Sequence, residues 1–124
     1  MDFELPPDLV ELRARVAAFV RDEVIPLEKK GGGFPSADEL KALRQKARDA
    51  GIYGPQLPRE YGGLGLGTVA MCVVFEQAGR SLLGPLALHC SAPDEGNMHL
   101  LSIYATPEQR EQYLRPLVEG RIRS

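Results

Sequence analysis

Two histidines and two cysteines are the side chains of this sequence best suited to metal binding or nucleophilic catalysis: His89, His99, Cys72 and Cys90. A zinc site needs three or four such ligands at short spacings, and these four residues do not provide that pattern. A nucleophile built from Cys90 with His89 or His99 is conceivable, but no third residue is placed to orient the base. We therefore interpret all four as structural residues.

Glycine-rich stretches offer a second kind of chemistry, because backbone amides at the start of a helix bind phosphates. Gly65-Leu66-Gly67 opens a predicted helix and resembles part of a dinucleotide-binding fingerprint. That fingerprint must follow a buried strand and precede an acidic residue by about twenty positions. The segment before it, Pro58–Tyr61, does not read as a strand, so we interpret the loop as a tight turn. The run Gly31–Gly33 lacks the lysine and serine of a phosphate-binding loop.

Asp94 and Glu95 are adjacent carboxylates that could serve as acid and base. Two acids in the first turn of a helix more often interact with the positive end of the helix dipole. The charges between Lys41 and Asp49 have the spacing of a solvated helix face. From the residues alone, the sequence therefore predicts no self-sufficient catalytic constellation.

The composition is that of one soluble globular domain spanning residues 1–124, with 44% hydrophobic and 26% charged residues. A net charge of -2 provides no attraction for nucleic acid or for an anionic membrane, so neither is expected as a partner. No apolar run is long enough to span a membrane, and the start, Met1–Glu4, does not resemble a signal peptide. We expect a cytoplasmic protein with reduced thiols at Cys72 and Cys90.

The elements that must position these residues are predicted to be helices, because apolar residues recur at steps of three and four. Five helices are expected, covering Leu9–Ile25, Ser36–Gly51, Thr68–Ala78, Pro93–Tyr104 and Thr106–Gly120. Ser36 and Thr106 begin capping boxes, Thr68 is expected to cap the third helix, and Ser91 or Ala92 the fourth.

Prolines and glycines set the predicted ends of these helices. Pro26 should stop the first helix, with Lys29–Gly33 forming a loop, and Pro116 should bend the last one. The run Val69–Phe75 is apolar nearly all round and predicts a centrally buried helix. No segment alternates like a strand. The expected fold is an all-α bundle of about five helices, with a long irregular Gly/Pro-rich connection, Ile52–Gly67, between helices two and three.

Four segments, in this order, resemble the N-terminal domain of acyl-CoA dehydrogenases. They are RVAAFVRDEVIP (15–26), PREYGGLGLG (58–67), FEQAGRS (75–81) and YATPEQREQYL (104–114). The resemblance covers almost the whole chain, and Leu83–Ala87 and Asp94–Met98 resemble a subgroup that includes bacterial and long-chain-type members.

The resemblance implies a flavoenzyme that converts a fatty acyl-CoA to a trans-2-enoyl-CoA with FAD as cofactor and a separate electron acceptor. In this family the helical domain is followed by a middle β-domain and a C-terminal bundle, which hold most of the flavin and the catalytic glutamate. By resemblance, this chain carries no catalytic residue, is inactive alone, and is not expected to bind FAD alone.

The resemblance also places the Leu88–Glu95 region where the family lines its acyl pocket. Leu88, Ser91, Ala92, Asp94 and Asn97 are the predicted substrate-binding residues. Exposed apolar faces of an isolated domain are expected to favour a homo-oligomer. The alternative hypothesis is a stand-alone helical interaction or acyl-binding module without redox activity. An open reading frame that continues past the codon for Ser124 would favour the enzyme.

Overall fold

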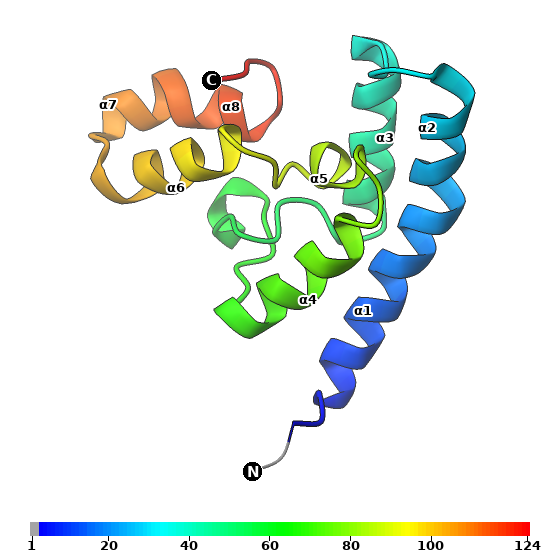
Figure 1. The fold of residues 1–124 in the computed structure, drawn as a ribbon. Helices are drawn as coiled ribbons and strands as arrows, with labels where there is room; N and C mark the ends of the chain where they lie inside the picture. Colours follow the sequence, from blue (N-terminus) through cyan, green and yellow to red (C-terminus); the bar gives the residue numbers. More distant parts are fainter. Residues whose placement is uncertain (1–2) are drawn as a thin grey trace.

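The structure is a computed structural model that describes residues 3–124, apart from the side chains at positions 29 and 31. Met1 and Asp2, on which the expectation of no signal peptide partly rests, lie outside the described residues. The fold is entirely helical, with no strand among the described residues, which confirms the predicted all-α class. A long N-terminal rod stands beside α3 (Ala37–Asp49), while α6 (Asp94–Tyr104) and the C-terminal helix lie on the opposite side of the molecule (Figure 1).

The N-terminal rod does not stop at Pro26, so the predicted end of the first helix near Ile25 is wrong. Helix α1 (Pro7–Phe19) passes through a π-helical turn, η1 (Val20–Val24), into α2 (Ile25–Gly31). In the wider turn the Ile25 amide donates to the Val20 carbonyl. Pro26 is then a second-position residue of a new helical segment, where its missing N–H costs no hydrogen bond. The predicted loop therefore shrinks to the residues after Gly31, and Gly32 ends the helix in the left-handed conformation.

The last helix contains the same arrangement. Helix α7 (Pro107–Gln109) passes through the π-helical turn η3 (Arg110–Leu114) into α8 (Arg115–Val118), in which Pro116 is again the second residue. The π-helical turn just before Pro116 thus accommodates this proline, where the sequence predicted a bend. Gly120 follows with a φ of 76°, as the predicted end of this helix requires.

Both predicted capping boxes are confirmed. The Glu39 amide donates to Ser36 Oγ at 3.2 Å, and the Ser36 amide donates to Glu39 Oε2 at 2.8 Å. Thr106 and Gln109 make the equivalent pair of bonds at the start of α7. These bonds satisfy amides that have no partner inside their helices.

Two predicted caps are wrong. Helix α4 (Thr68–Ala78) begins after Gly67, and Thr68 is its first residue rather than its cap. Helix α6 begins after Pro93 without any side-chain cap, because the Ser91 carbonyl already accepts the Glu95 amide. Backbone bonding starts that helix, so neither Ser91 nor Ala92 is needed to cap it.

The segment between α3 and α4 is irregular except for a 3-10 turn, η2 (Arg59–Tyr61), and Tyr53 and Leu57 within it are buried. Helix α4 is less buried than predicted. Ala70, Val73, Val74 and Ala78 face the core, but Val69 is 64% exposed. The apolar stretch after α4 forms a short helix, α5 (Gly84–Ala87), that the sequence pattern did not predict because Gly84-Pro85 interrupts it.

Two apolar cores hold the helices together. The larger core joins α1, η1, α3, α4 and α5, and includes Val16, Val74 and Leu88. The smaller core consists of Met98, Leu114, Leu117 and Val118 from α6, η3 and α8, together with Leu57 from the irregular connection. The segment from Leu88 to Asp94 runs from the larger core to α6, which contributes to the smaller core. We call the region where this segment passes between the two cores the junction.

Candidate functional site

The predicted substrate-binding segment crosses from α5 to α6, and the structure places its five residues in different environments. Leu88 is fully buried in the larger core, so it supports the segment from behind. Ser91 is half-buried, and its Oγ is a buried atom without a hydrogen-bond partner. Ala92 is exposed. The exposed side chain of Ala92 is thus the part of this segment available to a ligand, whereas the Ser91 hydroxyl is covered.

Asp94 and Asn97 are brought together by Ser124. The Ser124 amide and hydroxyl each donate to Asp94 Oδ1 at 2.9 Å, and Asn97 Nδ2 donates to Ser124 Oγ at 2.9 Å. Arg123 Nε lies 3.5 Å from the second carboxylate oxygen of Asp94. Burial raises the pKa of Asp94, but the Ser124 hydrogen bonds and the charge of Arg123 outweigh it and hold that pKa below its ordinary value. Asp94 is therefore an ionised anchor for residues 123–124, and is poorly suited to serve as a general base.

His89 is the most constrained side chain of the junction. It is fully buried, and its φ of 57° is rare for a residue other than glycine. Its Nε2 donates to the Leu117 carbonyl at 2.7 Å, and its ring stacks on Tyr53 with the centroids 5.5 Å apart. Burial, with help from the charge of Arg44, lowers the pKa of His89 to about 4, so the ring is neutral at pH 7.

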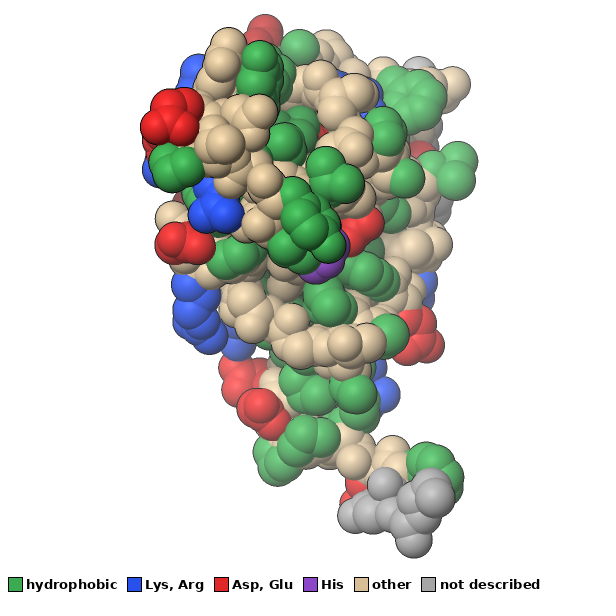
Figure 2. All heavy atoms as spheres, turned by 90° about the vertical axis from the view of Figure 1, so that its left-hand side faces the viewer, with side chains coloured by type: hydrophobic (Ala, Val, Ile, Leu, Met, Phe, Trp, Pro, Cys, Tyr) green, Lys and Arg blue, Asp and Glu red, His purple; other side chains and the backbone are tan. Residues whose placement is uncertain are grey.

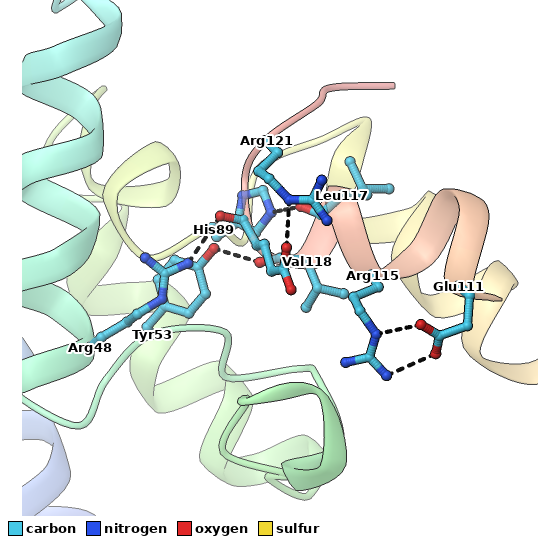
Figure 3. A network of polar contacts seen from close by, with 9 residues as sticks. Arg48, Tyr53, His89, Glu111, Arg115, Leu117, Val118 and Arg121 are labelled. Carbon is cyan, nitrogen blue, oxygen red and sulfur yellow. Dashed lines mark hydrogen bonds and ion pairs between the residues drawn. The ribbon is translucent and has the colours of Figure 1, made fainter.

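Tyr53 joins the same network from the irregular connection. Its hydroxyl donates to the Val118 carbonyl at 2.7 Å, and the Arg48 guanidinium lies 3.9 Å from its ring centroid. Figure 3 shows His89 and Tyr53 side by side, each reaching a carbonyl at the end of α8. These two bonds tie the C-terminal helix to the larger core, and they fix the position of the Leu88–Asn97 segment between them.

The nucleophile hypothesis finds no support in this geometry. His89 Nδ1 has no hydrogen-bond partner, so it does not activate the neighbouring thiol. Burial raises the pKa of Cys90 to about 12, which keeps the thiol protonated and unreactive. Among the described residues, no group of three or more potential ligands could hold a metal ion.

An apolar pocket of 330 Å³ adjoins the predicted segment between α6 and the C-terminal helix. Asn97 lies on its rim, and its walls include Leu100, Leu101, Tyr113 and Leu117. On this side of the molecule, hydrophobic side chains reach the surface over α6 to α8 (Figure 2), and they include Leu100, Ile103 and Tyr104. A concave apolar surface with a few polar groups at its edge is typical of a binding site for an apolar ligand.

The described residues do not fit a flavin. The Gly65-Leu66-Gly67 turn leads into α4, no strand precedes it, and Leu66 packs on the larger core. No cradle for a dinucleotide forms there.

Several residues of the junction were missed by the sequence pattern. Tyr53 lies in the connection predicted to be irregular and was assigned no functional role, and His89 was interpreted as an ordinary structural residue. The residue type of His89 does not by itself predict a positive φ, and no sequence pattern predicts the contacts of Ser124.

Comparison with known proteins bears directly on this arrangement. Residues 6–121 match the family model described as "Acyl-CoA dehydrogenase, N-terminal domain". Among curated proteins, "Probable acyl-CoA dehydrogenase FadE2" of Mycobacterium tuberculosis is 34% identical over 100% of this chain and 32% of its own length. Mouse "Acyl-CoA dehydrogenase family member 10" is 36% identical over 97% of this chain and 12% of its own length.

A solved structure shows the same fold. "Structure of a putative acyl-CoA dehydrogenase from Mycobacterium abscessus" superposes with a TM-score of 0.85 and 37% identity, over 98% of this chain and 34% of that one. This chain spans 32% of the length of FadE2, about a third. With a matching family model over nearly all of its length, the chain belongs to the acyl-CoA dehydrogenase family as its N-terminal helical domain.

Proposed function

We propose that this chain forms one wall of the acyl-binding cleft of a flavin-dependent acyl-CoA dehydrogenase. The wall would consist of Ser91, Ala92, Asn97 and the apolar pocket beside Asn97, with Leu88 supporting it from the core and Asp94 anchoring its edge. The observation that carries the proposal is that an apolar pocket adjoins the segment that the family resemblance assigns to the acyl chain.

In this proposal the chemical step belongs to polypeptide beyond the described residues. The parent reaction removes two hydrogens from a fatty acyl-CoA and passes electrons through FAD to an acceptor. Here His89 is buried, neutral and bonded to a carbonyl, and Asp94 is bound by Ser124. These groups position the wall and hold no proton that a substrate could reach.

The cytoplasmic location and self-association of the chain are also proposals. Both cysteines are free thiols, as expected in a reducing compartment. Within residues 3–124, no helix has the length and apolar character needed to cross a membrane. The exposed side chains of Leu100, Ile103 and Tyr104 would favour self-association of a chain whose apolar face is uncovered.

The chain alone is expected neither to bind flavin nor to oxidise a substrate. Purified protein incubated with FAD and a fatty acyl-CoA should remain colourless after desalting and should not reduce an artificial electron acceptor. Absorption spectroscopy and a dye-reduction assay provide the two measurements. A flavin that stays bound, or dye reduction that depends on the acyl-CoA, would contradict the proposal.

The alternative, a stand-alone acyl-binding module, predicts a different result in the same sample. Such a module would bind one fatty acyl-CoA per chain with saturation in a calorimetric titration, without any redox activity. A cleft with only one wall should bind the acyl chain weakly, because most of the ligand surface would remain in water. Saturable binding without turnover would therefore favour the module.

A further inference from the structure

A second pocket, which we call the α3 pocket, shares Ile122 and Arg123 with the pocket beside Asn97 but lies along α3. It has a volume of 460 Å³ and runs along one face of α3, opposite residues 119–123. Its lining includes five cationic side chains, Lys41, Arg44, Arg48, Arg121 and Arg123, and two acidic ones, Asp38 and Glu119. The chain as a whole has a net charge of -2, so this excess of positive charge is local.

Arg44 is the unusual member of this set, because it is only 5% exposed. Its Nε donates to the Leu86 carbonyl at 3.0 Å, but its Nη2 is a buried atom with no hydrogen-bond partner. Gly120 leaves room for the guanidinium, since a Cβ at that position would lie 2.7 Å from Arg44 Nη1. A buried cation with an unused donor is costly unless an anion pairs with it.

The neighbouring charges do not provide that anion. Glu119 Oε2 accepts from Arg121 Nε at 2.6 Å, and Asp94 pairs with Arg123 at 3.5 Å. Arg48 is held by the Glu119 carbonyl at 3.2 Å and by the Tyr53 ring. Burial lowers the pKa of Arg44; Tyr53 and the Asp94 carboxylate oppose this, and the charges of Arg123 and Arg48 act in the same direction as burial.

Lys41 is exposed one turn before Arg44 on the same face of α3, and no ion pair is formed by its side chain among the described residues. Leu40 and Ile122 add apolar surface to the pocket. Among the described residues, the lining therefore combines three cations without a carboxylate ion-pair partner, Lys41, Arg44 and Arg48, with room for an organic group. Phosphate is the anion whose several oxygens best match clustered arginine and lysine donors.

We propose that the α3 pocket binds a phosphate-type oxyanion, with Arg44 and Lys41 as the groups that contact it. The oxyanion is either inorganic phosphate or the phosphate of a small organic ester, whose organic part would lie against Leu40 and Ile122. The two contact groups, Arg44 and Lys41, are not part of the proposed acyl wall, and the test of this site does not depend on that function.

The test is a titration of the 124-residue chain followed by NMR, with sodium phosphate, phenyl phosphate and sodium acetate at constant ionic strength. Saturable shifts of the amide resonances of α3 and residues 119–123 are expected with the phosphates and not with acetate. Tighter binding of phenyl phosphate would identify an organic ester as the ligand class, and equal binding would identify inorganic phosphate. Shifts that do not saturate, or that acetate reproduces, would overturn the proposal.

Variants separate this site from general electrostatics. Arg44→Met and Lys41→Gln should each raise the dissociation constant for phosphate about tenfold, because each removes a charge-assisted hydrogen bond. The control Gln112→Glu lowers the net charge by the same amount as either substitution, at an exposed position on η3, and should leave the constant within about twofold. If Arg44→Met fails to fold, the exposed Lys41→Gln still carries the test. The proposed phosphate site would be contradicted if Lys41→Gln left the dissociation constant for phosphate unchanged, or if Gln112→Glu raised it as much as Lys41→Gln does.

Discussion

Replacing Gly84 with alanine is expected to lower the free energy of unfolding by about 3 kcal/mol or more, because no space exists for a side chain there. A Cβ on Gly84 would lie 1.9 Å from the carbonyl oxygen of Ala78 and 2.8 Å from its carbonyl carbon. Both are backbone atoms at the end of α4, so they cannot move without separating α4 from α5. Urea unfolding followed by far-UV circular dichroism measures the change.

Gly96 provides the matched control, because it lies in α6 and a methyl group added there would meet no neighbouring atom within 4 Å. Gly96→Ala should stabilise the chain by up to about 1 kcal/mol, since alanine favours a helix over glycine. Complete loss of cooperative unfolding in Gly84→Ala agrees with the expectation. Equal stabilities of the two variants would show that α4 and α5 do not meet as described.

Acid should destabilise the chain through His89. The pKa of the buried ring is about 4 in the folded chain, against 6.5 for an ordinary histidine. Between pH 6.5 and about pH 4, the histidine is therefore protonated in the unfolded state but not in the folded state. Stability falls as the pH is lowered through this range. The pKa shift of His89 corresponds to about 3 kcal/mol in the free energy of unfolding. This contribution is fully present above pH 6.5 and is lost by about pH 4.

His89→Asn isolates this contribution, because asparagine does not titrate and tolerates a positive φ. The wild-type chain should lose about 3 kcal/mol more than this variant between pH 6.5 and pH 4 in urea titrations. His99→Asn is the control for the loss of a histidine elsewhere in the chain, since His99 is exposed. If the free energy of unfolding fell equally with pH in the wild type and in His89→Asn, the assigned environment of the His89 ring would be contradicted.

Local rules predicted much of the fold. Capping boxes at Ser36 and Thr106 identified two helix starts, because both of their hydrogen bonds are made within four residues. The continuation of the first helix past Pro26 was not predicted. Proline usually ends a helix, and nothing in the residue pattern distinguishes a stop from a π-helical turn that accommodates the ring.

The candidate site was less predictable, because long-range contacts determine it. The tie between His89 and the Leu117 carbonyl spans 28 positions, and that between Tyr53 and the Val118 carbonyl spans 65. The resemblance to a family pointed to the Leu88–Asn97 segment, but it could not distinguish buried Leu88 from exposed Ala92. That distinction depends on packing between α5 and α6, which no short sequence pattern records.

The proposed acyl wall requires the Ser91–Asn97 region to contact the acyl chain of a substrate. The most direct test grafts residues 1–124 onto the remaining two thirds of FadE2, with which the chain is 34% identical. Ala92→Trp in this chimaera should lower kcat/KM for long acyl-CoAs about tenfold relative to short ones, with unchanged flavin content, because a bulky ring would narrow the cleft. Ala42→Trp, exposed on α3, should leave the chain-length profile unchanged. Identical profiles for the Ala92 variant and the unsubstituted chimaera would contradict the account.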